Sequence, residues 1–283
     1  MRVETIGVVG AGTMGRGIAQ AFAVSQFAVR LYDVDDSARD AAVNDIERRL
    51  DRDVERARIE PEQRDTALGL LDSVTELAAL GDTDIVIEAV FESHSIKEPI
   101  FRELDNVCRP EVILASNTSG LSISALASAT TRPEKVAGMH FFNPAPVMEL
   151  VEVVRGLLTN EETIETIVSL TDQLGKTPIL VQESPGHLVN RLLGVMLNEA
   201  AWSLMDGIAS AKEIDEAMKL GCGHTMGPLA TADLIGLDVC LSLMETLHEE
   251  FGEDKYRPCP LLRQMVRAGR LGRKTSQGFF NYD

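Results

Sequence analysis

Long apolar runs are missing from this sequence of 283 residues. No stretch approaches the ~20 consecutive apolar residues that a membrane-spanning helix needs. The first residues also lead directly into a short apolar segment, without the cationic start and long apolar core of a secretion signal. We therefore expect no membrane association and a cytoplasmic location.

Basic charge is scarce: 27 Lys and Arg residues stand against 44 Asp and Glu, for a net charge of -17. Such a chain repels nucleic acids and anionic membranes, so neither is expected as a partner. A polyanionic ligand would need a local cluster of basic side chains.

Cysteine is also rare, and the four residues lie far apart, without a Cys-x-x-Cys pair or a histidine at zinc-ligand spacing. We expect free thiols and no metal site. The cysteines are Cys108, Cys222, Cys240 and Cys259.

The first two thirds of the chain alternate between short β-branched apolar runs and helical patterns. This alternation is typical of βαβ units and predicts an α/β fold with a doubly wound, mainly parallel sheet. The expected strands are Thr5–Val9, Ala28–Tyr32, Ile85–Val90, Val112–Ser116, Val136–His140, Leu150–Val154 and Thr177–Val181.

The pattern changes after Ser184-Pro185-Gly186. From there on, apolar residues recur at helical spacing and no convincing strand follows. We predict a first domain over 1–182 and a smaller all-helical domain over 183–283.

A glycine triplet follows the first expected strand and opens a helix. Gly10, Gly12 and Gly15, with Thr13 and Met14 between them, form G-x-G-x-x-G. Glycines at this spacing allow a tight turn and close approach of the backbone to a pyrophosphate at the helix N-terminus. The context favours a Rossmann-type dinucleotide site over a purely structural turn.

The second expected strand ends at Asp33, about 20 residues beyond the triplet, where a carboxylate can accept hydrogen bonds from a ribose 2′-OH. The same carboxylate repels a 2′-phosphate. NAD is therefore expected rather than NADP, although the neighbouring Arg30 complicates this argument.

A histidine and a glutamate suggest the chemistry. His140 lies at the carboxyl end of an expected strand, where open α/β sheets bind ligands. Glu152 interrupts the apolar run of the next strand, and a buried carboxylate needs a partner. A Glu-bound imidazole is a general base for a hydroxyl proton. The alternative is a structural histidine with a solvent-facing glutamate.

Together these motifs resemble the 3-hydroxyacyl-CoA dehydrogenase family, and in particular its short stand-alone bacterial 3-hydroxybutyryl-CoA dehydrogenases. The resemblance covers essentially the whole chain, and the order and spacing of the strings agree. The strings are Gly10-Ala11-Gly12-Thr13-Met14-Gly15, Ala115-Ser116-Asn117-Thr118-Ser119, His140-Phe141-Phe142-Asn143-Pro144, Leu150-Val151-Glu152-Val153, Asn190-Arg191-Leu192, Gly272-Arg273-Lys274 and Gly278-Phe279.

The resemblance implies NAD-dependent interconversion of short L-3-hydroxyacyl-CoA and 3-ketoacyl-CoA, in fatty acid or butanoate metabolism. It makes His140 and Glu152 the catalytic dyad, with Ser119 and Asn190 beside them. Ser119, Asn143 and Asn190 would contact the substrate or the reacting end of the cofactor. The implied cofactor site further includes Glu92, Lys97, Asn117, Ser119, Asn143 and Lys274. Lys97 and Lys274 could instead be surface lysines, and Asn117 a turn residue.

By the same resemblance, Arg52, Arg56 and Arg58 meet the CoA phosphates. Acidic residues are interleaved with them, so a solvated helix with internal ion pairs is the alternative. The family also implies a homodimer, or a higher homo-oligomer, formed through the helical domain.

Two other functions remain open. A relative acting on a sugar acid such as L-gulonate would use the same dyad and cofactor without CoA. A non-catalytic NAD-binding or structural relative would keep the fold without turnover.

Overall fold

The computed structural model describes residues 3–282, and the chain divides into two units, Met1–Ser184 and Pro185–Asp283. The division lies two residues after the end of the first domain predicted at 182. The first unit has the predicted α/β class with a mainly parallel sheet, and the second is helical, as the sequence indicated.

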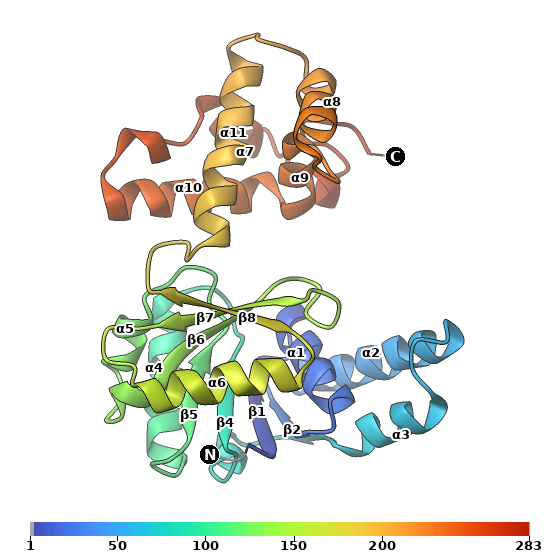
Figure 1. The fold of residues 1–283 in the computed structure, drawn as a ribbon, viewed down its shortest axis with the longest axis vertical. Coiled ribbons are helices and arrows are strands. Elements are labelled where there is room, and N and C mark those ends of the chain that lie inside the picture. The colour runs from blue at the N-terminus through green and yellow to red at the C-terminus, as the bar shows by residue number, and fades with distance from the viewer. Residues whose placement is uncertain (1–2, 283) are drawn as a thin grey trace. The chain divides into compact units, whose positions relative to one another are not determined.

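One sheet of eight strands forms the centre of the first unit, in the order β3-β2-β1-β4-β5-β6-β7-β8 (Figure 1). All neighbouring pairs are parallel except β6 and β7, which are antiparallel. The strands are β1 (Thr5–Val9), β2 (Ala28–Tyr32), β3 (Leu71–Val74), β4 (Ile85–Glu88), β5 (Ile113–Ser116), β6 (Val136–Phe141), β7 (Leu150–Arg155) and β8 (Thr177–Gln182).

Strand β3 was not predicted. It lies at the edge of the sheet and pairs only with β2 among the described residues. Its two central residues, Asp72 and Ser73, are exposed, so its sequence carries neither a continuous apolar run nor a regular alternation.

Helices cover both faces of the sheet (Figure 1). Side chains of α1, α2, α3 and α6 share one apolar cluster with the strands, and those of α4 and α5 share the other. Strands buried on both faces are continuous apolar runs, and this accounts for the prediction of β1, β4, β5, β6 and β7. β2 is only partly buried and β8 is largely exposed, although both were also predicted. The helices are α1 (Thr13–Val24), α2 (Asp36–Glu55), α3 (Pro61–Gly69), α4 (His94–Val107), α5 (Ile123–Ala127) and α6 (Glu161–Gln173).

The second unit has its own apolar core, built from residues such as Leu197, Ala232 and Leu262. Its helices are α7 (Val189–Met205), α8 (Ala211–Cys222), α9 (Pro228–Ile235), α10 (Leu237–Phe251) and α11 (Pro260–Arg267). The buried carboxylate of Asp233 holds the last residues in place, because it accepts hydrogen bonds of 2.9 Å from the Phe279 and Phe280 amides and the Tyr282 hydroxyl.

None of the described helices is long and apolar enough to cross a bilayer. Within residues 3–282, no cluster of three or more His, Cys, Asp or Glu side chains could hold a metal ion. All four cysteines are free thiols, as predicted, and only Cys222 is exposed.

Candidate active site

The glycine triplet forms the turn between β1 and α1. Gly10 has a φ of +102°, and a Cβ there would lie 2.8 Å from the carbonyl oxygen of Ala89. A Cβ on Gly15 would collide with the carbonyl of Gly10, so only glycine lets α1 pack this closely on the turn. At Gly12, in contrast, a Cβ would point into open space. The turn therefore leaves room for a ligand at Gly12, before the N-terminus of α1.

A cavity of about 560 Å³ adjoins this turn, and Asp33 lies in its wall. The Asp33 carboxylate accepts hydrogen bonds from the Ala11 amide at 2.7 Å and from the Asp35 amide at 3.1 Å. It is thus fixed beside the glycine turn at the end of β2. Arg30 is held by the Ala79 carbonyl at 2.6 Å and by Asp82 at 3.2 Å. The open cradle and the carboxylate fit a dinucleotide that ends in an unphosphorylated ribose.

His140 and Glu152 face each other across β6 and β7. They are directly opposite in the antiparallel register, and the Nδ1 of His140 lies 2.7 Å from Oε2 of Glu152. His140 is 5 % exposed and Glu152 is fully buried, so the alternative of a solvent-facing glutamate is wrong. A carboxylate at Nδ1 selects the tautomer in which Nε2 is the basic nitrogen.

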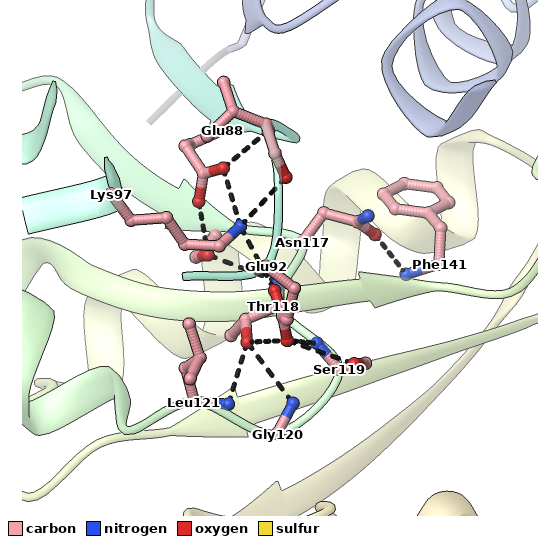
Figure 2. A network of polar contacts seen from close by, with 11 residues as sticks. Glu88, Glu92, Lys97, Asn117, Thr118, Ser119, Gly120, Leu121 and Phe141 are labelled. Carbon is pink, nitrogen blue, oxygen red and sulfur yellow. Dashed lines mark hydrogen bonds and ion pairs between the residues drawn. The ribbon is translucent and has the colours of Figure 1, made fainter. Parts of the chain in front are cut away.

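A second buried charge cluster connects β4, α4 and the loop after β5 (Figure 2). The ammonium of Lys97 lies 2.7 Å from Glu88 and 3.3 Å from Glu92. Glu92 in turn accepts hydrogen bonds from the Thr118 hydroxyl at 2.6 Å and from the amide and hydroxyl of Ser119 at 2.7 and 3.0 Å. Lys97 is 1 % exposed, so its alternative reading as a surface lysine is wrong.

These contacts determine the charge of Glu92, whose side chain is 38 % exposed. Burial favours its neutral form, but the charge of Lys97 and the hydrogen bonds from Thr118 and Ser119 outweigh this effect and lower the pKa of Glu92 below its usual value. Glu92 is therefore an anion that accepts the hydroxyl hydrogen bond of Ser119.

Asn117 joins this loop to the strand that carries His140. Its side-chain oxygen accepts a hydrogen bond of 2.8 Å from the Phe141 amide, one residue after His140 (Figure 2). Asn143 is exposed in the following loop. Asn117 and Ser119 thus lie in the loop after β5, and the dyad lies on the neighbouring strands β6 and β7. That these residues form one site stays a prediction.

A separate cavity of about 460 Å³ is lined by Arg49 and Arg52 of α2 and by Arg56 and Arg58, which follow that helix. The loop after His140 also lines it, at Pro144, Pro146 and Val147. Arg58 lies 3.2 Å from Asp53. Arg52 and Arg56 make no ion pair within residues 3–282, although both line the cavity. The predicted ion-pair network accounts for Arg48 and Arg49, which both contact Asp45, but not for these two.

Two predicted site residues belong to the second unit. Asn190 lies in the first turn of α7, and Lys274 lies near the end of the chain in an ion pair with Asp238. Their assignment to the substrate and the cofactor stays a prediction.

Sequence reasoning missed three members of the buried cluster, namely Glu88, Ser116 and Thr118. The signal was present, because Glu88 ends the apolar run Ile85–Glu88 in the same way that Glu152 interrupts its own strand. Applying the same argument to both strands would have found the cluster.

Comparison with known proteins adds independent evidence. The family profile described as "3-hydroxyacyl-CoA dehydrogenase, NAD binding domain" matches residues 5–184, and the "C-terminal domain" profile of the same family matches 186–282. A probable 3-hydroxybutyryl-CoA dehydrogenase of Bacillus subtilis is 47% identical over 283 residues, which span 100% of this chain and 99% of that protein.

Two further relatives agree. The 3-hydroxybutyryl-CoA dehydrogenase of Clostridioides difficile is 48% identical over 278 residues, covering 98% of this chain and 99% of that protein. The crystal structure of the (S)-3-hydroxybutyryl-CoA dehydrogenase from Ralstonia eutropha covers 100% of both chains, with a TM-score of 0.98 and 48% identity.

Proposed function

Because the chain belongs to the 3-hydroxyacyl-CoA dehydrogenase family, we propose that its buried His140–Glu152 pair is the general base of an NAD-dependent 3-hydroxybutyryl-CoA dehydrogenase. The 2.7 Å contact of the dyad is the observation that carries this assignment. NAD is the cofactor, and when bound it supplies the acceptor for the C3 hydride.

The dyad handles the proton of this reaction. The Nε2 of His140 takes the proton of the C3 hydroxyl while the C3–H bond gives up its hydrogen with both electrons. Glu152 stabilises the imidazolium that results, because a buried carboxylate at 2.7 Å compensates its charge. In the reverse direction the imidazolium returns the proton to the alkoxide.

Ser119 is assigned to the substrate hydroxyl. Its own hydroxyl donates to the anionic Glu92, and a hydroxyl oxygen that donates in this way can also accept hydrogen bonds through its lone pairs. It then orients the C3 hydroxyl toward His140. We assign Asn143 and Asn190 to neutral polar contacts with the thioester or the nicotinamide, and Lys274 to the cofactor, as the family resemblance implies.

Arg52 and Arg56 are assigned to the phosphates of CoA, with Arg58 beside them. In a chain with a net charge of -17, two arginines that line one cavity and have no ion-pair partner within the described residues 3–282 favour an anionic ligand. A sugar acid such as L-gulonate has no polyphosphate, so this cavity favours the CoA thioester over that substrate class.

The helical unit is proposed to form a homodimer. A groove of about 650 Å³ runs between α7 and α8, and its lining is mostly apolar, with Leu192, Val195, Met196, Ile214 and Met218. Apolar lining of this extent is typical of an interface. Light scattering of the purified chain measures the mass, and a monomer would contradict this part of the proposal.

Initial rates test the function itself. We expect oxidation of NADH with acetoacetyl-CoA, a much slower rate with NADPH, and none with L-gulonate and NAD. His140→Asn should abolish turnover while NAD still binds, as measured by calorimetry. If the variant turns over like the parent chain, His140 is not the base, and if only L-gulonate reacts, the CoA assignment fails.

A further inference from the structure

The buried charge cluster of Lys97, Glu92 and Glu88 contains one carboxylate to which no role has been given, that of Glu88. It is fully buried at the end of β4 and accepts three hydrogen bonds of 2.7 Å, from the Val90 amide, the Lys97 ammonium and the Ser116 hydroxyl. Lys97 reaches it from α4 (Figure 2). Ser116 reaches it from β5. Glu88 is therefore an anion whose partners come from its own chain segment and from two neighbouring elements.

Glu88 determines the direction of the Lys97 ammonium. An ammonium group has three N–H donors, and three acceptors surround this one: Glu88 at 2.7 Å, Glu92 at 3.3 Å and the Val90 carbonyl at 3.4 Å. The shortest of the three contacts, and the most buried, is that with Glu88. Of the other two acceptors, the Val90 carbonyl accepts a hydrogen bond, and Glu92, which holds both the amide and the hydroxyl of Ser119, lies at ion-pair distance.

We propose that Glu88 is a positioning residue of the dehydrogenase, which acts through Lys97 and Glu92 on Ser119. The proposal rests on the assignment of Ser119 to the substrate hydroxyl. Two carboxylates share one ammonium here, so the cluster keeps one net negative charge. Glu92 can thus remain a strong acceptor for Ser119 while Lys97 stays in place.

Stability alone does not account for this arrangement. A buried ion pair contributes little net stability relative to apolar side chains of the same volume, because desolvation of the two charges offsets their attraction. What the pair adds is geometry, since each charge fixes the direction of its partner's hydrogen bonds.

A double-mutant cycle with Ser119→Ala tests the proposal, with kcat measured at saturating NAD. Glu88→Gln keeps the size of the side chain but removes its charge, and we expect kcat to fall roughly tenfold, the effect of one charge-assisted hydrogen bond. In the Ser119→Ala background the same substitution should lower kcat less than twofold. Residues that act through one another show such non-additive effects.

A purely structural role predicts a different result. Loss of folded protein would lower kcat by the same factor in both backgrounds, and that outcome would overturn the proposal. Glu98→Gln is the matched control, because Glu98 also carries a charge on α4 but pairs outward with Arg102. It should leave kcat unchanged.

A second pair of variants separates stability from positioning. Replacing both charges in Glu88→Gln/Lys97→Met removes the uncompensated ammonium, so thermal stability should recover relative to Glu88→Gln. The proposal expects kcat to stay low, and recovery of kcat together with stability would contradict it. If the parent chain does not reduce acetoacetyl-CoA at all, the proposed function fails before this test begins.

Discussion

The substitution Glu152→Gln tests the role of the carboxylate charge in the proposed dyad. Gln has the same length as Glu and can still accept a hydrogen bond from Nδ1 of His140, which lies 2.7 Å from Glu152 in the parent chain. The geometry should therefore survive, while the charge that stabilises the imidazolium is lost. The substitution separates the electrostatic part of the dyad from its positioning part.

The magnitude follows from the contact. A buried hydrogen bond to a charged group contributes about 1–2 kcal/mol more than one between neutral groups. This difference corresponds to a loss of roughly 5- to 30-fold in kcat.

The loss should appear in both directions of the reaction, because the proton passes through the imidazole in each. Steady-state kcat with acetoacetyl-CoA and NADH in one series, and with 3-hydroxybutyryl-CoA and NAD in the other, measures it.

Glu149→Gln is the control for this experiment. Glu149 lies three residues before Glu152 but is exposed, and the same loss of one charge there should leave kcat unchanged. If both variants keep the kcat of the parent chain, the carboxylate at 152 does not stabilise the imidazolium and the reasoning is refuted.

Three further predictions concern other parts of the molecule. Gly15→Ala should lower the melting temperature and abolish NAD binding, because the added Cβ collides with the turn. Gly12→Ala should fold normally and lose only NAD affinity. Calorimetry and thermal unfolding distinguish the two variants, and equal stability of both would contradict the packing argument. Glu92→Gln should be less stable than the parent at neutral pH. Because the pKa of Glu92 is lowered in the folded protein, this difference in stability should shrink as the pH falls below the ordinary pKa of about 4.5, and vanish below the folded pKa. Urea titrations down to pH 3 measure it, and a stability difference that stays constant over this range would contradict the prediction. In the native protein a thiol reagent should label Cys222 alone, because the other cysteines are buried. Burial also raises the pKa of Cys108 to about 11 and that of Cys240 to about 12. Rapid labelling of more than one thiol would be inconsistent with this burial.

The sequence indicated the parts of the fold where apolar residues are regular. Most of the strands were predictable because burial on both faces leaves continuous apolar runs. The helical second unit was predictable from apolar residues at helical spacing, and the glycine turn because a tight turn requires glycine. Strand β3 was not, since backbone pairing at the edge of the sheet imposes no apolar pattern on Asp72 and Ser73. Edge strands of this kind are defined by a neighbour that lies far away in sequence.

Within the site, residue type and position were predictable, but pairing was less so. The partner of Glu152 could be guessed because one nearby histidine was available. The sequence did not identify the partners of Lys97, because Glu88 lies at the end of β4 and Glu92 in the loop after it. The arginines in and after α2 posed a similar problem, because only the structure shows that Arg49 pairs with Asp45 whereas Arg52 and Arg56 line the cavity without an ion pair among the described residues.

The dyad depends on the one place where the sheet departs from parallel pairing. Residues 142–149 are too few for the crossover that a parallel strand requires, so β7 returns antiparallel to β6. In an antiparallel pair, residues directly opposite each other project from the same face, and this register sets His140 against Glu152. A shift by one residue would turn the glutamate to the other face, where it would be buried without the imidazole. The length of this loop therefore fixes the acid–base geometry, and inserting a residue there should damage catalysis more than the conservative Glu152→Gln substitution does.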